Sequence, residues 1–292
     1  LAGERIAMRK DAVALTKFFY WLENEAMKTP QTEITLAQKL GEYRAMEENY
    51  TDDSFCTIAG WKGNGAIVHY HATEEECANI EGEGVLLLDS GGQYLDGTTD
   101  ITRTVWVGNP ANIPAAVKRD YTAVLKGHIA LACARFPKGT RGNQLDVLAR
   151  QFLWAEGMTY GHGTGHGVGH VLGVHEGPVQ IRKNHRGDTV LPIKVGQVIT
   201  DEPGIYVAGK FGVRIENCLL CIEDRQTEYG KFLKFEPLTL CPYDSSLIDV
   251  AMLTEEERTW LNEYHAMVCE KLLPLLSNDD EKAWLIRATA KL

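Results

Sequence analysis

Two separate stretches of the sequence follow one pattern, and this repetition constrains the fold more than any other feature. In each stretch a glycine leads an apolar strand that ends in an acid, and a turn and a second strand with another acid follow. Gly84 begins the first unit and Gly196 the second, and the four acids are Asp89, Asp100, Glu202 and Glu216. Helical segments precede both units. The order of elements therefore predicts an α+β fold, with helices covering one face of a mainly antiparallel sheet.

Hydrophobic periodicity gives the expected positions of the elements. Helical spacing is found in residues 9–28, 35–48, 115–136, 141–156 and 253–276. Strand character is found in residues 66–70, 85–89, 100–107, 198–200 and 213–222. Thr35 and Gln38 have the spacing of a capping box at the second helix. No linker rich in proline, glycine or serine divides these elements, so we expect one domain over residues 1–292.

Charge and cysteine content exclude some classes of protein. The formal net charge of -10 argues against a nucleic-acid partner, which needs a surface of clustered Lys and Arg. The seven cysteines lack the spacing of a disulfide framework and favour a reducing, cytoplasmic location. Cys218 and Cys221 form a C-x-x-C, but residues three apart on a strand point to opposite faces. We interpret them as buried apolar residues rather than a redox or zinc pair.

The apolar stretches and the N-terminal residues of the chain bear on membrane insertion and secretion. No stretch approaches the ~20 apolar residues of a membrane span, and no secretory signal opens the chain, so we expect no membrane partner. The sequence begins at Leu1 rather than at methionine and enters a predicted helix within a few residues. We expect this to be a fragment whose N-terminal domain or domains have been removed.

The acids at the strand ends are the first candidates for chemistry. A carboxylate taken out of water without a partner costs several kcal/mol. No run of Lys or Arg in the sequence lies beside these acids, so a divalent cation is the expected partner. Asp89 alone, followed by Ser90 and two glycines, is also typical of a turn or an N-cap. Four such acids in two similar units favour the metal.

A segment rich in glycine and histidine lies between the two units. Glycine occupies every second position from 161 to 169, and the histidines are His162, His166, His170 and His175. If the segment is extended, the first three share one face. A phosphate loop does not fit, because the G-x-G-x-x-G spacing and a following Lys-Ser or Lys-Thr are absent. G-x-S-x-G and H-E-x-x-H are absent from the sequence as well, so acids and imidazoles around hard or borderline divalent metals remain.

Together these motifs resemble the aminopeptidase P group of the pita-bread metallopeptidases. The similar segments are residues 88–94, 96–104, 161–175, 201–204 and 212–217, with a tail containing Trp260 and Trp284 like that of the eukaryotic cytosolic enzymes. The resemblance extends from the first predicted helix to the C-terminus. It implies the pita-bread fold, with a pseudo-twofold antiparallel sheet covered by helices. It also implies a catalytic domain that other domains precede.

The resemblance also implies a ligand for each matching position. It makes Asp89 the terminal ligand of one metal, Asp100 and Glu216 the bridging ligands, and His166 and Glu202 the terminal ligands of the second metal. Two divalent ions are implied, manganese first and cobalt or zinc as alternatives. The implied reaction is hydrolysis of the N-terminal Xaa-Pro bond by a hydroxide that bridges the two metals. Peptides with proline at the second position are the implied partners, and a homodimer is common in relatives.

Catalytic roles follow from the same resemblance. Glu202 takes up the proton and passes it to the proline nitrogen, and His175 donates to the oxyanion. His69 holds the substrate, and His162 contacts the proline side or relays a proton. Arg214 is expected to hold a ligand carboxylate from behind. His170 departs from the pattern and is interpreted as a surface residue.

Other functions on the same fold stay open at this point. A methionyl aminopeptidase or an X-Pro dipeptidase has the same kind of centre with another specificity. A pita-bread interaction module without catalysis is a different class of protein, and such modules typically lack metal ligands. Here all five ligand positions match, which favours an enzyme.

Overall fold

The structure is a computed structural model that describes residues 1–171, 173–183 and 191–292. Its α-helices are α1 (Ala2–Asn24), α2 (Glu33–Ala45), α3 (Ala115–Ala132), α4 (Gly142–Ala155), α5 (Glu255–Leu272) and α6 (Asp279–Ala288). Short 3-10 helices include η2 (Lys62–Ala66) and η5 (Ser245–Leu247). The five predicted helices are confirmed with shifted ends, and α6 was not predicted.

Most strands are short, and in the described residues the strands pair only with antiparallel neighbours. They are β1 (Tyr50–Asp53), β2 (Ile58–Trp61), β3 (Gly84–Ser90), β4 (Gly92–Tyr94), β5 (Gly97–Thr98), β6 (Ile101–Val107), β7 (Arg135–Pro137), β8 (Gly165–His166), β9 (Gln180–Ile181), β10 (Val198–Asp201), β11 (Gly204–Val207), β12 (Phe211–Arg214), β13 (Asn217–Thr227) and β14 (Gly230–Pro237). The α+β class and its antiparallel pairing are confirmed, although the strands form several small sheets rather than one.

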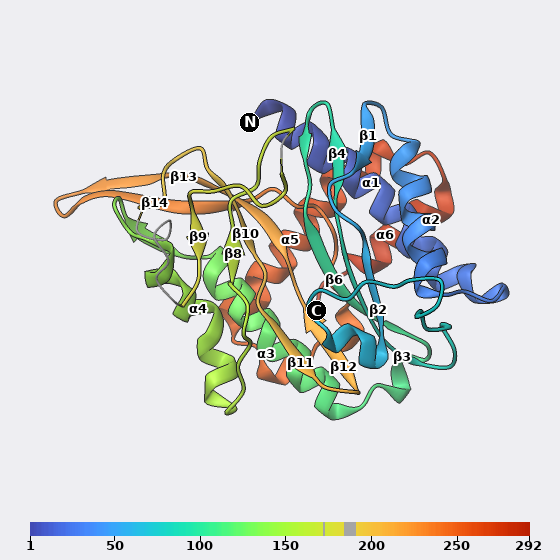
Figure 1. Cartoon of the computed structure of the whole chain (residues 1–292). Coiled ribbons are helices and arrows are strands. Elements are labelled where there is room, and N and C mark those ends of the chain that lie inside the picture. Colours follow the sequence, from blue (N-terminus) through green and yellow to red (C-terminus); the bar gives the residue numbers. More distant parts are fainter. Residues whose placement is uncertain (172, 184–190) are drawn as a thin grey trace.

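The two repeated sequence units form two main sheets. The first has the order β2-β3-β6 and the second the order β10-β13-β14-β7. Helices α1 and α2 lie beside the first sheet, and α3 and α4 lie on the side of the second (Figure 1). The β13–β14 hairpin extends away from the body of the molecule (Figure 1). Each sheet thus has its own preceding helix pair, as the sequence repeat predicts.

Continuous apolar runs make the central strands. The four residues of β3 from Val85 to Leu88 are all buried, because both faces of this strand are covered. On β13, Cys218 and Cys221 are both fully buried free thiols that belong to different hydrophobic clusters. Their assignment as buried apolar residues on opposite faces is confirmed.

The predicted strand at residues 66–70 is wrong. The strand in this region is β2, and the chain then turns through η2. Two features force this turn: Lys62 has a φ of 50°, and the backbone of Gly65 approaches Gly60 so closely that a Cβ on Gly60 would lie 2.6 Å from it. Ile67 is 55% exposed, so the apolar residues of this run are not core residues.

The predicted strand at residues 213–222 is two strands in two sheets. β12 pairs with β11, whereas β13 pairs with β10. The break falls at Ile215 and Glu216, whose amides donate to carbonyl oxygens outside both ladders. The predicted capping box was also wrong by three residues, because Thr32 caps α2 and Thr35 occupies its N3 position.

The molecule has a cavity of about 540 Å³ away from the predicted site. Phe19, Trp106 and Trp284 are among its lining residues, and it contains none of the predicted acids or histidines. Across the described ranges, no helix combines the length and apolar character that a membrane crossing requires.

Candidate metal centre

The side chains predicted as metal ligands come from five segments that meet between the two sheets. Asp89 lies near the end of β3, and Asp100 lies directly before β6. His166 ends β8, Glu202 directly follows β10, and Glu216 lies in the gap between β12 and β13. Each acid therefore lies close to the end of a strand. The register of the two units brings the acids to one region of the molecule.

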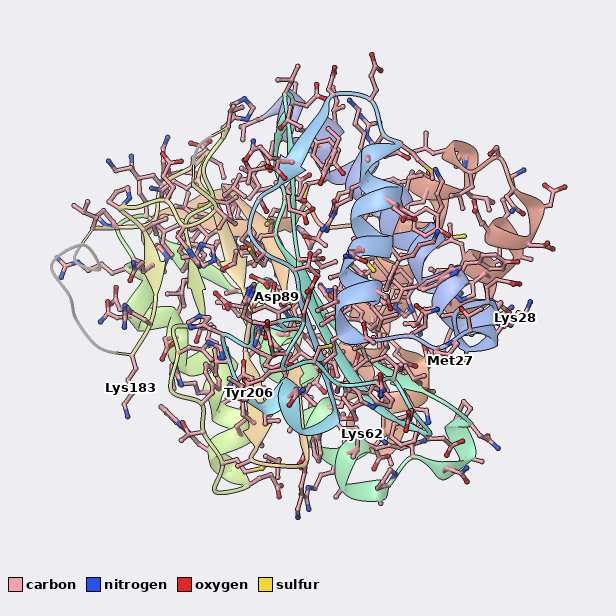
Figure 2. The ribbon with its side chains drawn as sticks, turned by 45° about the vertical axis from the view of Figure 1, so that its right-hand side comes forward. Met27, Lys28, Lys62, Asp89, Lys183 and Tyr206 are labelled. Carbon is pink, nitrogen blue, oxygen red and sulfur yellow. The ribbon has the colours of Figure 1, made fainter. Side chains whose placement is uncertain are left out.

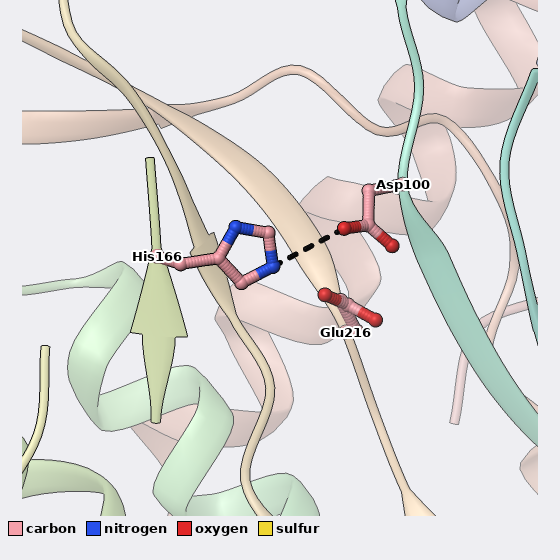
Figure 3. A group of neighbouring side chains, drawn as sticks. All are labelled: Asp100, His166 and Glu216. Carbon is pink, nitrogen blue, oxygen red and sulfur yellow. Dashed lines mark ion pairs between the residues drawn. The ribbon is translucent and has the colours of Figure 1, made fainter. Parts of the chain in front are cut away.

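Three of these side chains form a compact group. Asp100, His166 and Glu216 each offer one ligand atom, and these atoms all lie within 4.8 Å of one another. Figure 3 shows the three side chains pointing toward one another from separate segments. Nε2 of His166 lies 3.3 Å from Oδ2 of Asp100 and 3.6 Å from Oε1 of Glu202. Glu202 thus lies close to the same imidazole nitrogen as Asp100.

Asp89 joins the group through an arginine. One guanidinium nitrogen of Arg214 donates to Oδ2 of Asp89 at 2.6 Å, and both side chains are largely buried. The other oxygen of Asp89, Oδ1, is buried without a hydrogen-bond partner in the described part of the chain. The prediction that Arg214 holds one of these carboxylates is confirmed. Asp89 lies near the middle of the molecule, whereas Lys28 and Lys183 lie toward opposite edges (Figure 2).

The protonation of His166 suits a ligand. Its Nδ1 lies 2.9 Å from the carbonyl oxygen of Gly167. A carbonyl oxygen only accepts hydrogen bonds, so Nδ1 carries a hydrogen and the other ring nitrogen is the one that faces the acids. Once Nε2 loses its own proton, its lone pair is free for a cation. A backbone contact thus fixes which nitrogen can bind.

Without a cation, this group of acids is costly. Burial raises the pKa of Asp100, although His166 opposes the shift. Burial raises the pKa of Glu202 to about 7, and burial with the charges of Asp100 and Glu202 raises the pKa of Glu216. Burial disfavours a charged His166, but the contact with Asp100 and the charge of Glu202 outweigh it and raise its pKa to about 9. In a cation site without its metal, protons take the place of the cation. The acids then resist ionisation, and the imidazole keeps its proton. The residues present show this pattern and therefore fit a metal.

Three other predicted histidines surround this group. The ring centroid of His175 lies 4.2 Å from that of His166, and His175 and His69 are both exposed. His162 is part-buried, with Nδ1 2.7 Å from the carbonyl oxygen of Gly163 and Nε2 2.7 Å from the hydroxyl of Tyr206. Burial lowers the pKa of His162 to about 4, so its ring is neutral and accepts from the tyrosine.

The hypothesis that His170 shares a face with His162 and His166 is wrong. His170 is exposed and points toward Glu4 of α1, with a 3.7 Å separation between Nδ1 and Oε2. The segment is not one regular strand, since β8 contains only Gly165 and His166. The assignment of His170 to the surface is confirmed.

The sequence did not predict the polar residues that form hydrogen bonds with the acids and with Arg214. Thr102 donates to Oε2 of Glu216 at 2.7 Å, and Thr200 donates to Oε1 of Glu202 at 3.2 Å. Tyr206 accepts from Arg214 at 2.8 Å. Each of the two threonines lies on a strand, two residues from an acid in sequence, and this spacing is a local signal that marks them.

These features define the class of the protein as an α+β chain whose two related strand units surround a candidate metal centre. The family model described as metallopeptidase family M24 matches residues 2–223, and the model for the C-terminal region of peptidase M24 matches residues 231–292. The chain belongs to metallopeptidase family M24.

Individual relatives and solved structures give a more specific comparison than the family models. A probable Xaa-Pro aminopeptidase P of Aspergillus niger is 47% identical over 99% of this chain and 47% of its own length. Aminopeptidase P2 of Arabidopsis thaliana is 45% identical over 100% of this chain and 41% of its own length. The crystal structure of an X-prolyl aminopeptidase from Caenorhabditis elegans, described as a cytosolic enzyme with a di-nuclear active site, has a TM-score of 0.90 and 42% identity, covering 100% of this chain and 47% of that one. The chain spans about half the length of the curated relatives it matches.

A more distant structure shows the same fold. The prolidase from Thermococcus sibiricus has a TM-score of 0.66 and 29% identity over 83% of this chain and 60% of its own. The pita-bread fold expected from the motifs is thereby confirmed.

We expect the stabilisation of the chain by Mn²⁺ to increase with pH. The pKa values of Glu202 and His166, about 7 and about 9 in the metal-free centre, lie above their ordinary 4.5 and 6.5. Protons bound to these two groups stabilise the metal-free fold. This stabilisation is complete at pH values below the ordinary pKa values, and it is lost as the pH rises through about 7 and about 9. A cation must displace the same protons. Thermal unfolding with Mn²⁺ and with chelator, at about pH 6 and about pH 8, measures the difference, and an equal Mn²⁺ effect at both values contradicts the expectation.

Proposed function

We propose that this chain is the catalytic domain, over residues 1–292, of a metal-dependent aminopeptidase that hydrolyses the peptide bond between an N-terminal residue and proline. The convergence of Asp100, His166 and Glu216 within 4.8 Å carries the proposal. Membership in metallopeptidase family M24 supports the type of reaction. The similarity to relatives named Xaa-Pro aminopeptidase P, over 99% of this chain, supports the specificity.

The proposed centre holds two divalent cations. Their ligands are Asp89, Asp100, His166, Glu202 and Glu216, and the printed description of the Caenorhabditis elegans structure as di-nuclear supports the pair. When bound, the cations supply Lewis-acid polarisation of the peptide carbonyl and make a water molecule more acidic. Four carboxylates and one imidazole favour Mn²⁺ over Zn²⁺ or Co²⁺, because carboxylate oxygens suit manganese and additional imidazoles or thiolates suit zinc.

The chain's own residues supply the proton transfers in this proposal. Glu202 accepts the proton of the attacking water and passes it to the proline nitrogen as the peptide bond breaks. His175, exposed beside His166, donates to the oxygen on which negative charge develops. His69, also exposed, holds the substrate at the entrance. His162, hydrogen-bonded to Tyr206, borders the proline side or relays a proton through that tyrosine.

The alternatives on the same fold are less well supported. The prolidase structure is less similar, with a TM-score of 0.66 against 0.90 for the X-prolyl aminopeptidase, which favours an aminopeptidase over an X-Pro dipeptidase. A non-catalytic module has no need for four neighbouring acids and an oriented imidazole. Met-Ala, Ala-Pro and Arg-Pro-Pro as substrates separate the methionyl aminopeptidase, the dipeptidase and the proposed activity.

The cellular setting is proposed from the same comparisons. The description of the Caenorhabditis elegans relative as cytosolic supports a cytoplasmic location, and the seven free cysteines of this chain agree with it. A homodimer is proposed from the family resemblance and is tested by light scattering of the purified chain.

The activity is tested with a metal-stripped preparation of the chain. We expect hydrolysis of Arg-Pro-Pro after the arginine in the presence of Mn²⁺, and loss of that hydrolysis on chelation, because the buried acids cannot all ionise without a cation. Release of free arginine is measured, with metal content determined on the same sample. Hydrolysis that persists after complete chelation, or cleavage of Met-Ala in preference to Arg-Pro-Pro, contradicts the proposal.

A further inference from the structure

The hydroxyl of Thr102 lies between a guanidinium and one of the proposed ligands. Thr102 is on β6, its side chain is fully buried, and its Oγ1 donates to Oε2 of Glu216 at 2.7 Å. Nε of Arg214 lies 3.2 Å from the same hydroxyl oxygen. The amide of Glu216 also donates to the carbonyl oxygen of Thr102 at 3.0 Å. Side chain and main chain of Thr102 therefore both hold Glu216.

The direction of these hydrogen bonds is fixed by their chemistry. A guanidinium N–H only donates, so the Thr102 oxygen accepts from Arg214. The hydroxyl has one hydrogen, and that hydrogen is left for Glu216. Oε2 of Glu216 thus faces a fixed donor in a buried site, where an unmade hydrogen bond is expensive. The rotation of the Glu216 carboxylate is limited accordingly.

The contact also joins the two strand units. Arg214 donates through another nitrogen to Oδ2 of Asp89 at 2.6 Å. A continuous chain of hydrogen bonds therefore runs from Asp89 through Arg214 and Thr102 to Glu216. Asp89 and Thr102 belong to the first repeated unit, and Arg214 and Glu216 to the second. This chain connects a proposed terminal ligand with a proposed bridging ligand.

We infer that Thr102 is a positioning residue that orients the Glu216 carboxylate for cation binding and couples its orientation to that of Asp89. The inference rests on the proposed function, because it takes both acids as metal ligands. Residues that form a hydrogen bond with a metal ligand typically contribute a factor of about 10–100 to the affinity for the metal. Thr102 is expected to contribute in that range.

Thr102→Val tests the inference, because valine keeps the shape of threonine and removes the hydroxyl. It leaves Nε of Arg214 and Oε2 of Glu216 without this partner. We expect the affinity for Mn²⁺ to fall by about 10–100-fold, and Thr102→Ser, which keeps a hydroxyl, to stay within about threefold of the unmodified chain. Should Thr102→Val not fold, Thr102→Ala is measured in the same way, since it leaves room for water beside the two groups.

Thr104→Val is the matched control. Thr104 lies two residues further along the same strand, on the same face, and is equally buried. Its hydroxyl donates to the carbonyl oxygen of Arg214 at 2.9 Å and accepts from the amide of Arg214 at 3.1 Å. The control variant therefore loses the same number of hydrogen bonds, but none of them reaches a carboxylate.

The measurement is calorimetric titration of each metal-stripped chain with Mn²⁺, together with thermal unfolding of the metal-free forms. We expect similar losses of unfolding temperature in the two valine variants, and weaker Mn²⁺ binding in Thr102→Val alone. Unchanged Mn²⁺ affinity in Thr102→Val, or an equal loss in Thr104→Val, overturns the inference. If the unmodified chain binds Mn²⁺ without cleaving Arg-Pro-Pro, the proposed activity fails while the comparison still decides the role of Thr102. If it binds no Mn²⁺, both fail.

Discussion

Replacing Glu202 by glutamine is expected to lower kcat/KM for Arg-Pro-Pro by about 10²–10⁴-fold, while the chain stays folded. Glutamine has the size of glutamate and can still accept the hydrogen bond from Thr200, which is 3.2 Å long. It cannot take up the proton of the attacking water. It also removes the negative charge that lies 3.6 Å from His166 and belongs to the proposed charge balance of the cations.

The stability of this variant separates a chemical defect from unfolding. Burial raises the pKa of Glu202 to about 7, so the charged form destabilises the metal-free fold above that pH. A neutral amide removes this cost, and the metal-free variant should unfold at a temperature no lower than the unmodified chain at about pH 8.

The kinetic measurement needs a control and a metal assay. Glu223→Gln makes the same chemical change on β13, where the side chain is 68% exposed and about 3.7 Å from Lys231, and it should leave kcat/KM within about twofold. Each variant is assayed with saturating Mn²⁺, and its metal content is determined. Activity of Glu202→Gln within about threefold of the unmodified chain would remove Glu202 from its proposed role.

The positions of the acids could be predicted because they depend on local rules. A buried apolar strand that ends in a carboxylate is visible in the sequence, and β3 with Asp89 follows that rule. The repetition of this arrangement predicts a second pair of acids at strand ends, but the sequence predicted one sheet where the structure has two main sheets. β14 was not predicted, because Phe232 and Leu233 are adjacent apolar residues that interrupt a strict alternation over residues 231–235.

The contacts between the units could not be predicted from local rules. The hydrogen bonds of Thr102 to Glu216 and of Arg214 to Asp89 join residues 114 and 125 positions apart. No periodicity encodes such distances, since they depend on how the two sheets pack. Arg214 was predicted only through a family resemblance. The direction of the His170 side chain could not be predicted from the glycine-rich segment, because glycine removes the steric limits that keep a strand regular.

The contacts between the two sheets also contribute to the stability of the fold. We expect that stability to depend on Arg103 more than on any other residue of these contacts. Its side chain is fully buried on β6, and its guanidinium carbon lies 4.4 Å from the ring centroid of Tyr243. It donates to neutral oxygen atoms on Thr102, Glu216, Asn217, Cys241, Pro242 and Tyr264. These partners come from both strand units, from the segment that leads to η5 and, with Tyr264, from α5. One side chain thus donates hydrogen bonds to oxygen atoms in several separate parts of the fold.

Replacing Arg103 by methionine is expected to destabilise the fold by more than about 5 kcal/mol, which is as large as the whole stability of many domains. Methionine fills part of the volume but removes the donor to buried carbonyl oxygens, including those of Glu216 and Pro242. Urea denaturation measures the change, and most of the variant should be unfolded without urea. Arg119→Met is the control, because Arg119 is 49% exposed and pairs with the adjacent Asp120, so about 1 kcal/mol or less is expected. A loss below about 1 kcal/mol in Arg103→Met would show that the two units hold together without this connection.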